Sequence, residues 1–256
     1  MTKPFEVIDV DDRNVDACDY CGANSLGHAR KREWIRQCLP LGLRYKTIVE
    51  SATGKTAGMI EYMPAGSAWR AVQAKNHLVI HCVQVPKKYA GQGLGSLLIQ
   101  ECIRDAQRHH MDGVVALATQ DGWCADKRIF LKNSFEVVDQ AAPAFELLVL
   151  RLRQSTLPTF GDWKQRAQAL GIGIFMYNSK QCPFMRGDKN YTRKTWLKSK
   201  YGLDATVIEV NDYWAAQANP CVWGTAGVVC NGEIINYVPG GDAHLVNKLK
   251  RLNVIR

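Results

Sequence analysis

A glycine-rich segment in the first half of the chain has the composition of a phosphate-binding loop. Residues 90–96 read Ala-Gly-Gln-Gly-Leu-Gly-Ser, after an apolar stretch at 77–85 and before an amphipathic stretch at 96–109. Glycines take positive φ without strain and let backbone N–H groups approach a pyrophosphate, and a helix N-terminus adds about half a positive charge. Because the segment joins a predicted strand to a predicted helix, the pattern predicts a cofactor-binding loop rather than a plain glycine turn.

Two other phosphate-binding loops fit the sequence less well. A dinucleotide-binding loop needs an acidic residue near the end of the next strand, and none stands at the right distance. A P-loop ends in Gly-Lys followed by Ser or Thr, which this segment lacks. Both alternatives are therefore disfavoured.

The loop and the residues that follow it resemble the core of the GNAT superfamily of N-acetyltransferases. The loop of that family, Gln/Arg-x-x-Gly-x-Gly/Ala, is matched by residues 90–95, and its aromatic-x-x-x-Gly-Phe motif is similar to residues 130–135, Phe-Leu-Lys-Asn-Ser-Phe. The runs at 60–66, 68–71 and 80–82 resemble a bacterial subgroup whose members carry a distinct C-terminal domain. The resemblance implies a GNAT fold and N-acetyltransferase activity.

The resemblance also implies acetyl-coenzyme A as the cofactor. Main-chain groups of Val83 and Val85 would pair with its pantetheine arm, and Lys87 and Lys88 would lie near its phosphates. The residues expected to contact the cofactor are Val83, Gln84, Val85, Lys88, Tyr89, Ala90, Gly91, Gln92, Gly93, Leu94, Gly95, Ser96, Trp123 and Phe130.

The chain departs from the family at two of these positions. Ala90 stands where Gln or Arg is usual, so one side-chain contact to a phosphate is missing. Phe130 stands where many members have the Tyr that protonates the departing thiolate. A thiolate with a pKa of about 8.5 can leave without full assistance, so these differences do not exclude acyl transfer.

Transfer to an amine requires a residue that accepts a proton. His81 is the first candidate, because period-2 alternation places it with Val83 on one face of the cofactor strand and an ordinary pKa of about 6.5 suits the task. A core histidine is the alternative interpretation. Glu61, which interrupts the apolar strand beside it, is the second candidate, with a surface position as its alternative.

The remaining site residues concern the acceptor and a covalent route. Tyr62, Trp69 and Arg70 are expected to line the acceptor pocket. Cys124 could carry an acyl group, but direct transfer is favoured for this family. The acceptor is expected to be an amine of a small molecule or a peptide.

Charge and composition predict two domains in the 256 residues. Residues 1–150 carry 18 basic and 17 acidic side chains, a net charge of +1, whereas residues 151–256 carry 15 and 7, a net charge of +8. Pro158 and Gly161 lie in an aperiodic segment between the halves. We therefore predict an acyltransferase domain at 1–152, a linker at 153–161 and an accessory domain at 162–256.

Apolar periodicity predicts the fold of each domain. The first is expected to be α/β (α+β), a GNAT mixed sheet with flanking helices. The second is expected to be a smaller thioredoxin-like α/β domain, with the order strand, helix, strand, helix, hairpin, helix. The predicted helices span 30–41, 96–109, 125–133, 162–170, 191–201 and 242–252. The predicted strands span 45–50, 56–63, 77–85, 114–119, 135–139, 145–151, 172–177 and 205–210, with a hairpin at 227–235.

The nine cysteines do not form a disulfide framework, because their number is odd and they are scattered along the chain. They indicate a reducing compartment. With no apolar run of the roughly 18–20 residues that a bilayer requires and no signal-peptide pattern, the protein is expected to be cytoplasmic and not membrane-bound. The Cys18-Asp-Tyr-Cys21 pair has too few neighbouring ligands for zinc, which needs about four, so no metal is predicted.

Cys182 is a candidate thiol site in the second domain. It follows a predicted strand at the start of the next helix region, where a helix end lowers the pKa of a thiol. Met185 replaces the second cysteine of a dithiol motif and Ala226 the cis-proline of the thioredoxin fold, so a binding module is favoured over redox chemistry. Basic residues nearby predict a solvated helix face or a docking surface for an anion or RNA, and these residues are Arg186, Lys189, Arg193, Lys194, Lys198 and Lys200.

Three alternatives to an acetyl-coenzyme A-dependent N-acetyltransferase remain open from the sequence. The chain could be a catalytically weak sensor or scaffold that binds coenzyme A. It could instead be a redox protein centred on Cys182, or an acyltransferase whose donor is an acyl-tRNA. The sequence also leaves the oligomeric state open.

Overall fold

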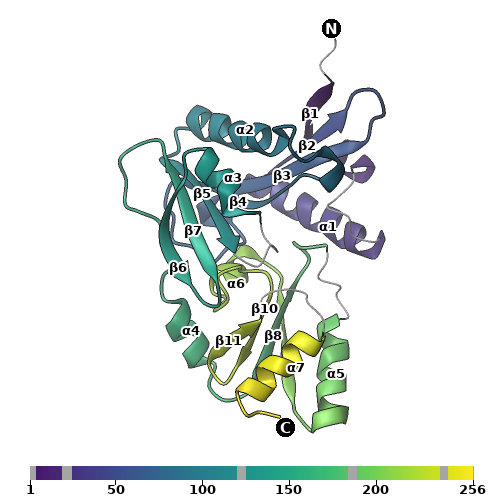
Figure 1. Cartoon of the computed structure of the whole chain (residues 1–256), viewed down its shortest axis with the longest axis vertical. Helices are drawn as coiled ribbons and strands as arrows, with labels where there is room; N and C mark the ends of the chain where they lie inside the picture. Colours follow the sequence, from purple (N-terminus) through teal and green to yellow (C-terminus); the bar gives the residue numbers. More distant parts are fainter. Residues whose placement is uncertain (1–3, 19–24, 120–124, 184–188, 237–241, 256) are drawn as a thin grey trace.

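The computed structural model describes residues 4–18, 25–119, 125–183, 189–236 and 242–255. The described residues form one sheet of seven strands and one of four. Figure 1 shows the larger sheet in the upper half of the molecule and the smaller one below it. Helices flank both sheets, so the predicted mixed α/β fold class is confirmed.

The larger sheet has the order β1-β2-β3-β4-β5-β7-β6. Its neighbouring strands are antiparallel except β4 and β5, which run parallel. The strands are β1 (Phe5–Val10), β2 (Arg44–Glu50), β3 (Thr56–Pro64), β4 (His77–Gln84), β5 (Gly113–Thr119), β6 (Glu136–Ala141) and β7 (Phe145–Arg151). The helices beside them are α1 (Ser25–Cys38), α2 (Leu94–Arg108) and α3 (Lys127–Lys132).

Helices α1 and α2 pack against different faces of the larger sheet. Leu98 and Cys102 of α2 share a core cluster with Ile80 of β4. Trp34 of α1 lies in another cluster with Val79, the preceding residue of β4. Because successive side chains of a strand point to opposite faces, both faces of β4 are buried.

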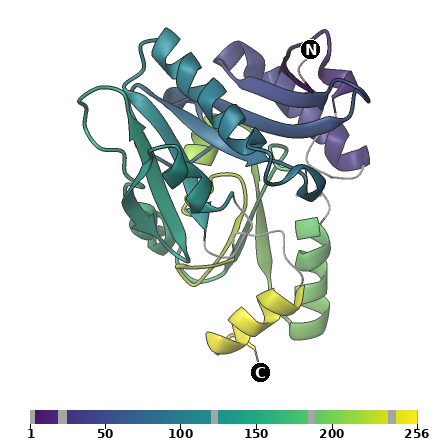
Figure 2. The same ribbon diagram turned by 45° about the horizontal axis from the view of Figure 1, so that its top comes forward.

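The smaller sheet has the order β11-β10-β8-β9, in which only β8 and β9 are parallel. Its strands are β8 (Ile174–Ser179), β9 (Ala205–Val210), β10 (Gly227–Cys230) and β11 (Glu233–Asn236). The nearby helices are α4 (Trp163–Ala169), α5 (Lys189–Tyr201), α6 (Tyr213–Gln217) and α7 (Asp242–Arg251). Each range predicted from β8 to α7 is found, and α6 is the helix for which no range was predicted. Figure 2 shows α5 and α7 side by side at the end remote from the larger sheet.

One hydrophobic cluster extends across both sheets. It contains Val79 of β4 together with Val229 of β10 and Trp223 of the preceding segment. The ring of Trp223 stacks on Phe145 of β7, with centroids 6.2 Å apart and an interplanar angle of 14°. The division into two domains stays a prediction, and this core crosses the proposed boundary.

The segment predicted as a linker packs against the larger sheet. Thr159 forms an isolated bridge with Gln73. Phe160 is 1% exposed, and its backbone N–H donates to the carboxylate of Asp139 at 2.7 Å. The end of the segment at 153–161 is therefore fixed in the structure rather than a free spacer.

One strand and one α-helix were not predicted. β1 is an edge strand whose side chains show no regular alternation of burial, so its pattern lacks a strand period. α6 has only 5 residues, which is too short for helical periodicity to appear. The predicted elements are all present. The strands predicted at 145–151 and 205–210 have those bounds, and the others have shifted ends, with the largest shift at α1, which begins at Ser25. In the described part of the chain, no helix has the length and apolar character that crossing a bilayer requires.

Replacing Trp223 with Ala tests whether the two sheets share one core. Since Trp223 is 7% exposed and stacks on Phe145, we expect the free energy of unfolding to fall by about 3 kcal/mol. Urea denaturation followed by circular dichroism measures this change. Trp214→Ala is the matched control, because Trp214 is 67% exposed, and it should change the value by less than about 0.5 kcal/mol. Equal stabilities of the two variants would mean that Trp223 does not join the sheets.

Candidate active site

The larger sheet opens between β4 and β5. Their parallel register runs from His77–Gly113 to Ile80–Ala116. β4 nevertheless continues its pairing with β3 as far as Gln84–Met59. A cavity of about 500 Å³ lies at this opening, a volume typical of small-molecule sites.

A β-bulge in β4 determines which side chains face the cavity. Glu61 pairs with Cys82 and Tyr62 pairs with Ile80, so His81 is an extra residue opposite the two. Ile80 and Val83 consequently share the core cluster under α2, whereas the ring of His81 lies 5.8 Å from that of Trp34, on the other face. The prediction that His81 and Val83 share one face is therefore wrong, because strict alternation does not hold through a bulge.

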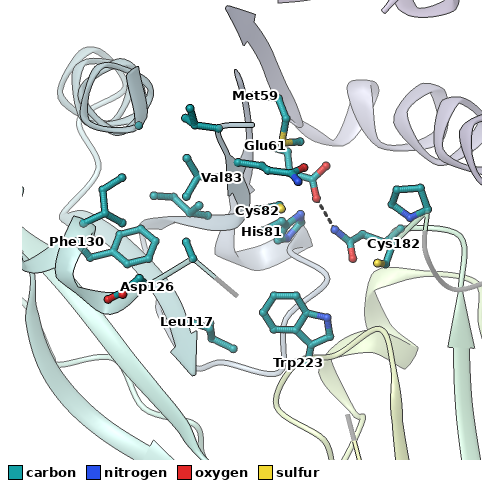
Figure 3. A pocket seen from close by; sticks show the side chains of 18 of the residues that line it. Met59, Glu61, His81, Cys82, Val83, Leu117, Asp126, Phe130, Cys182 and Trp223 are labelled. Atoms are coloured by element: carbon teal, nitrogen blue, oxygen red, sulfur yellow. Dashed lines mark hydrogen bonds between the residues drawn. The ribbon is translucent and has the colours of Figure 1, made fainter. Parts of the chain in front are cut away.

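The cavity is lined by residues of both sheets. Figure 3 shows Phe130 and Asp126 on one side of it and Glu61, His81 and Cys182 on the other. Near α2 and α3 the lining consists of Met59, Val83, Gln84, Val85, Gly95, Ala125, Asp126, Ile129 and Phe130. Elsewhere it consists of Lys31, Glu61, Ile80, His81, Cys82, Leu117, Gln181, Cys182, Pro183 and Trp223.

Glu61 belongs to a buried polar network. Its carboxylate forms an ion pair with Lys31, and both side chains are only 1% exposed. The Lys31 ammonium also donates to the backbone carbonyl of Gln181 at 2.7 Å, and the Gln181 side-chain amide donates to the other carboxylate oxygen of Glu61. The alternative of a surface position for Glu61 is wrong, because α1 and the turn after β8 cover it.

His81 is poorly placed to accept a proton. Its Nε2 accepts a hydrogen bond from the backbone N–H of Trp69 at 3.0 Å. An N–H group can only donate, so in the neutral ring the lone pair on Nε2 is occupied and Nδ1 carries the proton. Burial first, then the charges of Arg70 and Lys31, lowers the pKa of His81 well below its ordinary value.

Trp69 and Arg70 support the site without lining the cavity. The Arg70 guanidinium donates to the carbonyl of His81 at 2.5 Å and to that of Trp223 at 3.1 Å. It also lies 3.8 Å from the centroid of the Trp223 ring. Both residues are at most 1% exposed, so the prediction that they line an acceptor pocket is not met, and they hold His81 and Trp223 in place instead.

Tyr62 points away from the cavity. Its hydroxyl donates to the carboxylate of Asp105 on α2. The side chain is 0% exposed and lies in the cluster under α2, and burial raises the pKa of its hydroxyl. The structure therefore does not bring Tyr62 to an acceptor pocket, because Tyr62 follows Glu61 in β3 and faces the opposite side of the sheet.

The glycine loop leaves the N-terminus of α2 open. Gly91 and Gly93 have φ of 80° and 78°, and a Cβ at either would meet nothing within 4 Å. Gly93 is the N-cap of α2, and no side chain caps that end. The first N–H groups of a helix lack intrahelical partners and attract anions, so this end fits a phosphate. Gly95 has a different reason to be glycine, since a Cβ there would lie 2.4 Å from Cδ1 of Ile129.

The other residues predicted at the cofactor divide into exposed, cavity-lining and buried groups. Tyr89 is buried under the loop, where its hydroxyl donates to Glu50 at 3.3 Å. The Ser96 hydroxyl accepts from the side chain of Asn133 at 3.1 Å and caps nothing. Lys88, Ala90 and Gln92 are exposed, and Leu94 in the first turn of α2 is buried. Val83, Val85 and Phe130 line the cavity, as does Gln84, which is also exposed. Trp123 and Cys124 lie outside the described residues.

Two cysteines line the cavity from different sheets. Cys82 on β4 and Cys182 after β8 are both half-buried. Burial, with further contributions from Glu61 and Cys182, raises the pKa of Cys82 to about 12, so its thiol stays protonated at neutral pH. The sequence predicts a separate thiol site at Cys182, whereas in the structure Cys182 lines the same cavity as Glu61.

The basic cluster near Cys182 is not one solvated face. Arg193 is 3% exposed and donates to Asp242 of α7 at 2.8 Å, and Lys198 pairs with Asp204 at 2.6 Å. Lys194 and Lys200 are exposed. Arg186 lies outside the described residues. Among the residues that the structure describes, no three His, Cys, Asp or Glu side chains gather as metal ligands.

Lys31, Gln181 and Trp223 are site residues that the sequence analysis missed. Lys31 stands at helical spacing from Trp34, Ile35 and Cys38, which form the apolar stripe of α1. Its position on a buried face could therefore have been predicted. Gln181 and Trp223 lie in irregular segments between elements and carried no such signal.

Comparisons with known proteins find similarity over parts of the chain. A model of the acetyltransferase (GNAT) family matches residues 18–125. The chain is similar to the uncharacterized N-acetyltransferase YoaP of Bacillus subtilis (strain 168), with 29% identity over 225 residues, which are 87% of this chain and 86% of that protein.

Two solved structures are also similar over part of the chain. One is an acetyltransferase of the GNAT family from Staphylococcus aureus Mu50, which is 13% identical in sequence. The match covers 58% of this chain and 99% of that chain, with a TM-score of 0.42. The other is a GNAT family acetyltransferase from Brucella melitensis in complex with acetyl-CoA, which is 14% identical in sequence. The match covers 60% of this chain and 91% of that chain, with a TM-score of 0.38.

The neutral state of His81 predicts a loss of stability in acid. Unfolded histidine titrates at about 6.5, and His81 in the fold binds its proton only well below that value, so below about pH 6.5 the unfolded state holds more protons. As the pH falls from 6.5 toward the folded-state pKa, the free energy of unfolding should fall by up to about 1.4 kcal/mol per pH unit more in the wild type than in His81→Gln.

Urea denaturation at a series of pH values measures this difference. His109→Gln is the control, because His109 is exposed, and its curve should follow that of the wild type. If His81→Gln also follows the wild type, His81 titrates as an ordinary histidine and the argument for its neutrality fails.

Proposed function

We propose that this chain, whose residues 18–125 match a model of the acetyltransferase (GNAT) family, transfers an acetyl group from acetyl-coenzyme A directly to an amine acceptor. One observation carries the proposal. Gly95, in the first turn of α2, and the buried Glu61 line the same cavity. An anion-binding helix end and a proton acceptor beside one cavity are what acetyl transfer to an amine requires.

The residues around the cavity fit acetyl-coenzyme A. Backbone N–H groups at the open end of α2 would hold its phosphates, with the exposed Lys87 and Lys88 nearby. β4 leaves β5 after Ile80, so main-chain groups of Val83 and Val85 border the cavity where the pantetheine amides would lie. When bound, the cofactor supplies an acetyl thioester that an amine can attack.

We assign the role of general base to Glu61. A carboxylate has about four lone-pair sites, and Lys31 and Gln181 each use one, which leaves capacity for an N–H of the acceptor. Glu61 would take the proton that the acceptor nitrogen loses. His81 is the weaker candidate, because its lone pair on Nε2 already accepts from Trp69. Phe130 has no acidic proton, so this position offers no donor to the leaving thiol.

The cavity also limits the acceptor. Its volume of about 500 Å³ must hold the end of the pantetheine arm together with the reacting end of the acceptor. Its wall is mostly apolar and includes Met59, Leu117 and Trp223. We therefore propose a small-molecule amine, or the terminal amine of a peptide, as the acceptor.

Glu61→Gln tests the assignment of the base. The substitution keeps the shape and leaves an oxygen for Lys31 but removes the proton acceptor, so we expect kcat to fall by about 10²–10⁴-fold. Release of coenzyme A by chromatography over a panel of amines measures the rate, and calorimetry should show unchanged binding of acetyl-coenzyme A. Glu33→Gln is the control, because Glu33 pairs with Lys180 at the surface, and it should keep the wild-type rate.

Two results would contradict the proposal. A wild-type rate in Glu61→Gln would exclude Glu61 as the base. Binding of coenzyme A by the wild type, without turnover for any amine, would favour a sensor or scaffold over an enzyme.

A further inference from the structure

Gln181 brings the smaller sheet into contact with the proposed base. It follows β8 and is 3% exposed. Its side-chain amide donates to Oε1 of Glu61, and its backbone carbonyl accepts from the ammonium of Lys31 at 2.7 Å. One residue in the turn after β8 therefore contacts both members of the buried ion pair, through two different groups.

The turn that carries Gln181 is fastened to α1. The backbone carbonyl of Ser179 accepts from the guanidinium of Arg30 at 3.3 Å. Lys180 also forms an ion pair with Glu33, but this pair is exposed to solvent, where an ion pair contributes at most about 1 kcal/mol. The backbone N–H of Gln181 donates to the hydroxyl of Ser179 at 3.3 Å. The two contacts of Ser179, which Lys180 does not share, therefore hold the turn so that the amide of Gln181 lies against Glu61.

The hydrogen bond from Gln181 limits how the carboxylate of Glu61 can rotate. A carboxylate that had only Lys31 as partner could rotate until both oxygens faced the ammonium. With Gln181 present, Lys31 holds Oε2 and the amide holds Oε1. The two donors come from α1 and from the turn after β8, so they fix the plane of the carboxylate at the cavity wall.

We propose that Gln181 is a positioning residue, which orients Glu61 for proton transfer, and that the smaller sheet thereby completes the acyltransferase site. The proposal depends on the assignment of Glu61 as general base. Cys182, Pro183 and Trp223 of the same region line the cavity beside Gln181, so this region also forms part of the acceptor wall. Gln181 itself acts through Glu61.

Gln181→Met is the decisive variant. Methionine keeps the length and the approximate volume of the side chain and leaves the backbone bond to Lys31, but it cannot donate to Glu61. If Gln181 orients the base, kcat should fall by about 10–100-fold, since small misplacements of a reacting group have effects of this size. The KM for acetyl-coenzyme A should change by less than about twofold, because the loop at α2 is not touched.

Lys180→Met is the matched control. It alters the adjacent residue of the same turn and removes only the surface ion pair with Glu33. Its kcat and KM should equal those of the wild type. Equal losses in Lys180→Met and Gln181→Met, or a wild-type kcat in Gln181→Met, would overturn the proposal, because the first would indicate a general disturbance of the turn and the second no role in orientation.

A spectroscopic measurement separates this inference from the proposed function. Carbon-13 NMR of the protein labelled at glutamate carboxyl groups reports the hydrogen bonding of Glu61, whose signal is assigned by its absence in Glu61→Gln. We expect the signal to move in Gln181→Met and to stay in place in Lys180→Met. If Glu61→Gln keeps the wild-type rate while the signal moves, the base is misassigned but Gln181 still orients Glu61. If the signal does not move, Gln181 does not position Glu61, whatever the activity.

Discussion

The buried ion pair between Lys31 and Glu61 constrains the rest of the structure. Removing two charges from water costs several kcal/mol per ion, and their attraction offsets this only where the remaining donors and acceptors are also satisfied. Gln181 supplies one donor and one acceptor, and the ring of Trp34 lies 4.1 Å from the ammonium. These residues come from α1, β3 and the turn after β8, so the complete network exists only when both sheets are in place.

A second buried cation, Arg70, fixes the backbone next to that pair. Its guanidinium donates a hydrogen bond to the carbonyl of His81, the extra residue of the β4 bulge. The backbone N–H of Trp69 donates to the ring of the same histidine. The bulge returns Val83 to the face under α2 and leaves His81 and Cys82 beside Glu61. Because Arg70 also contacts Trp223, the strand that opens the sheet and the wall of the cavity are fixed by one side chain.

Local patterns in the sequence were sufficient for most elements and for the loop at residues 90–96, because strand alternation, helical periodicity and glycine spacing are properties of neighbouring residues. The bulge at His81 could not be predicted, since a single extra residue leaves the apolar pattern of β4 almost unchanged. The burial of Glu61 could not be predicted either, because Gln181, which covers it, is 120 positions further along the sequence. Lys31 was accessible in principle from its place on the apolar stripe of α1.

The contact between the sheets gives the smaller one a physical role in the chemistry that we propose. Two opposite charges about 4 Å apart attract by about 1 kcal/mol in bulk water, but by about 4 kcal/mol at an effective dielectric constant of about 20. An ion pair on the open face of the larger sheet would therefore contribute little and would leave Glu61 free to rotate. Coverage by Gln181 reduces the contact of the pair with water and strengthens its attraction, and Lys31 and Gln181 together leave part of the carboxylate's capacity for a proton from the cavity that Glu61 lines.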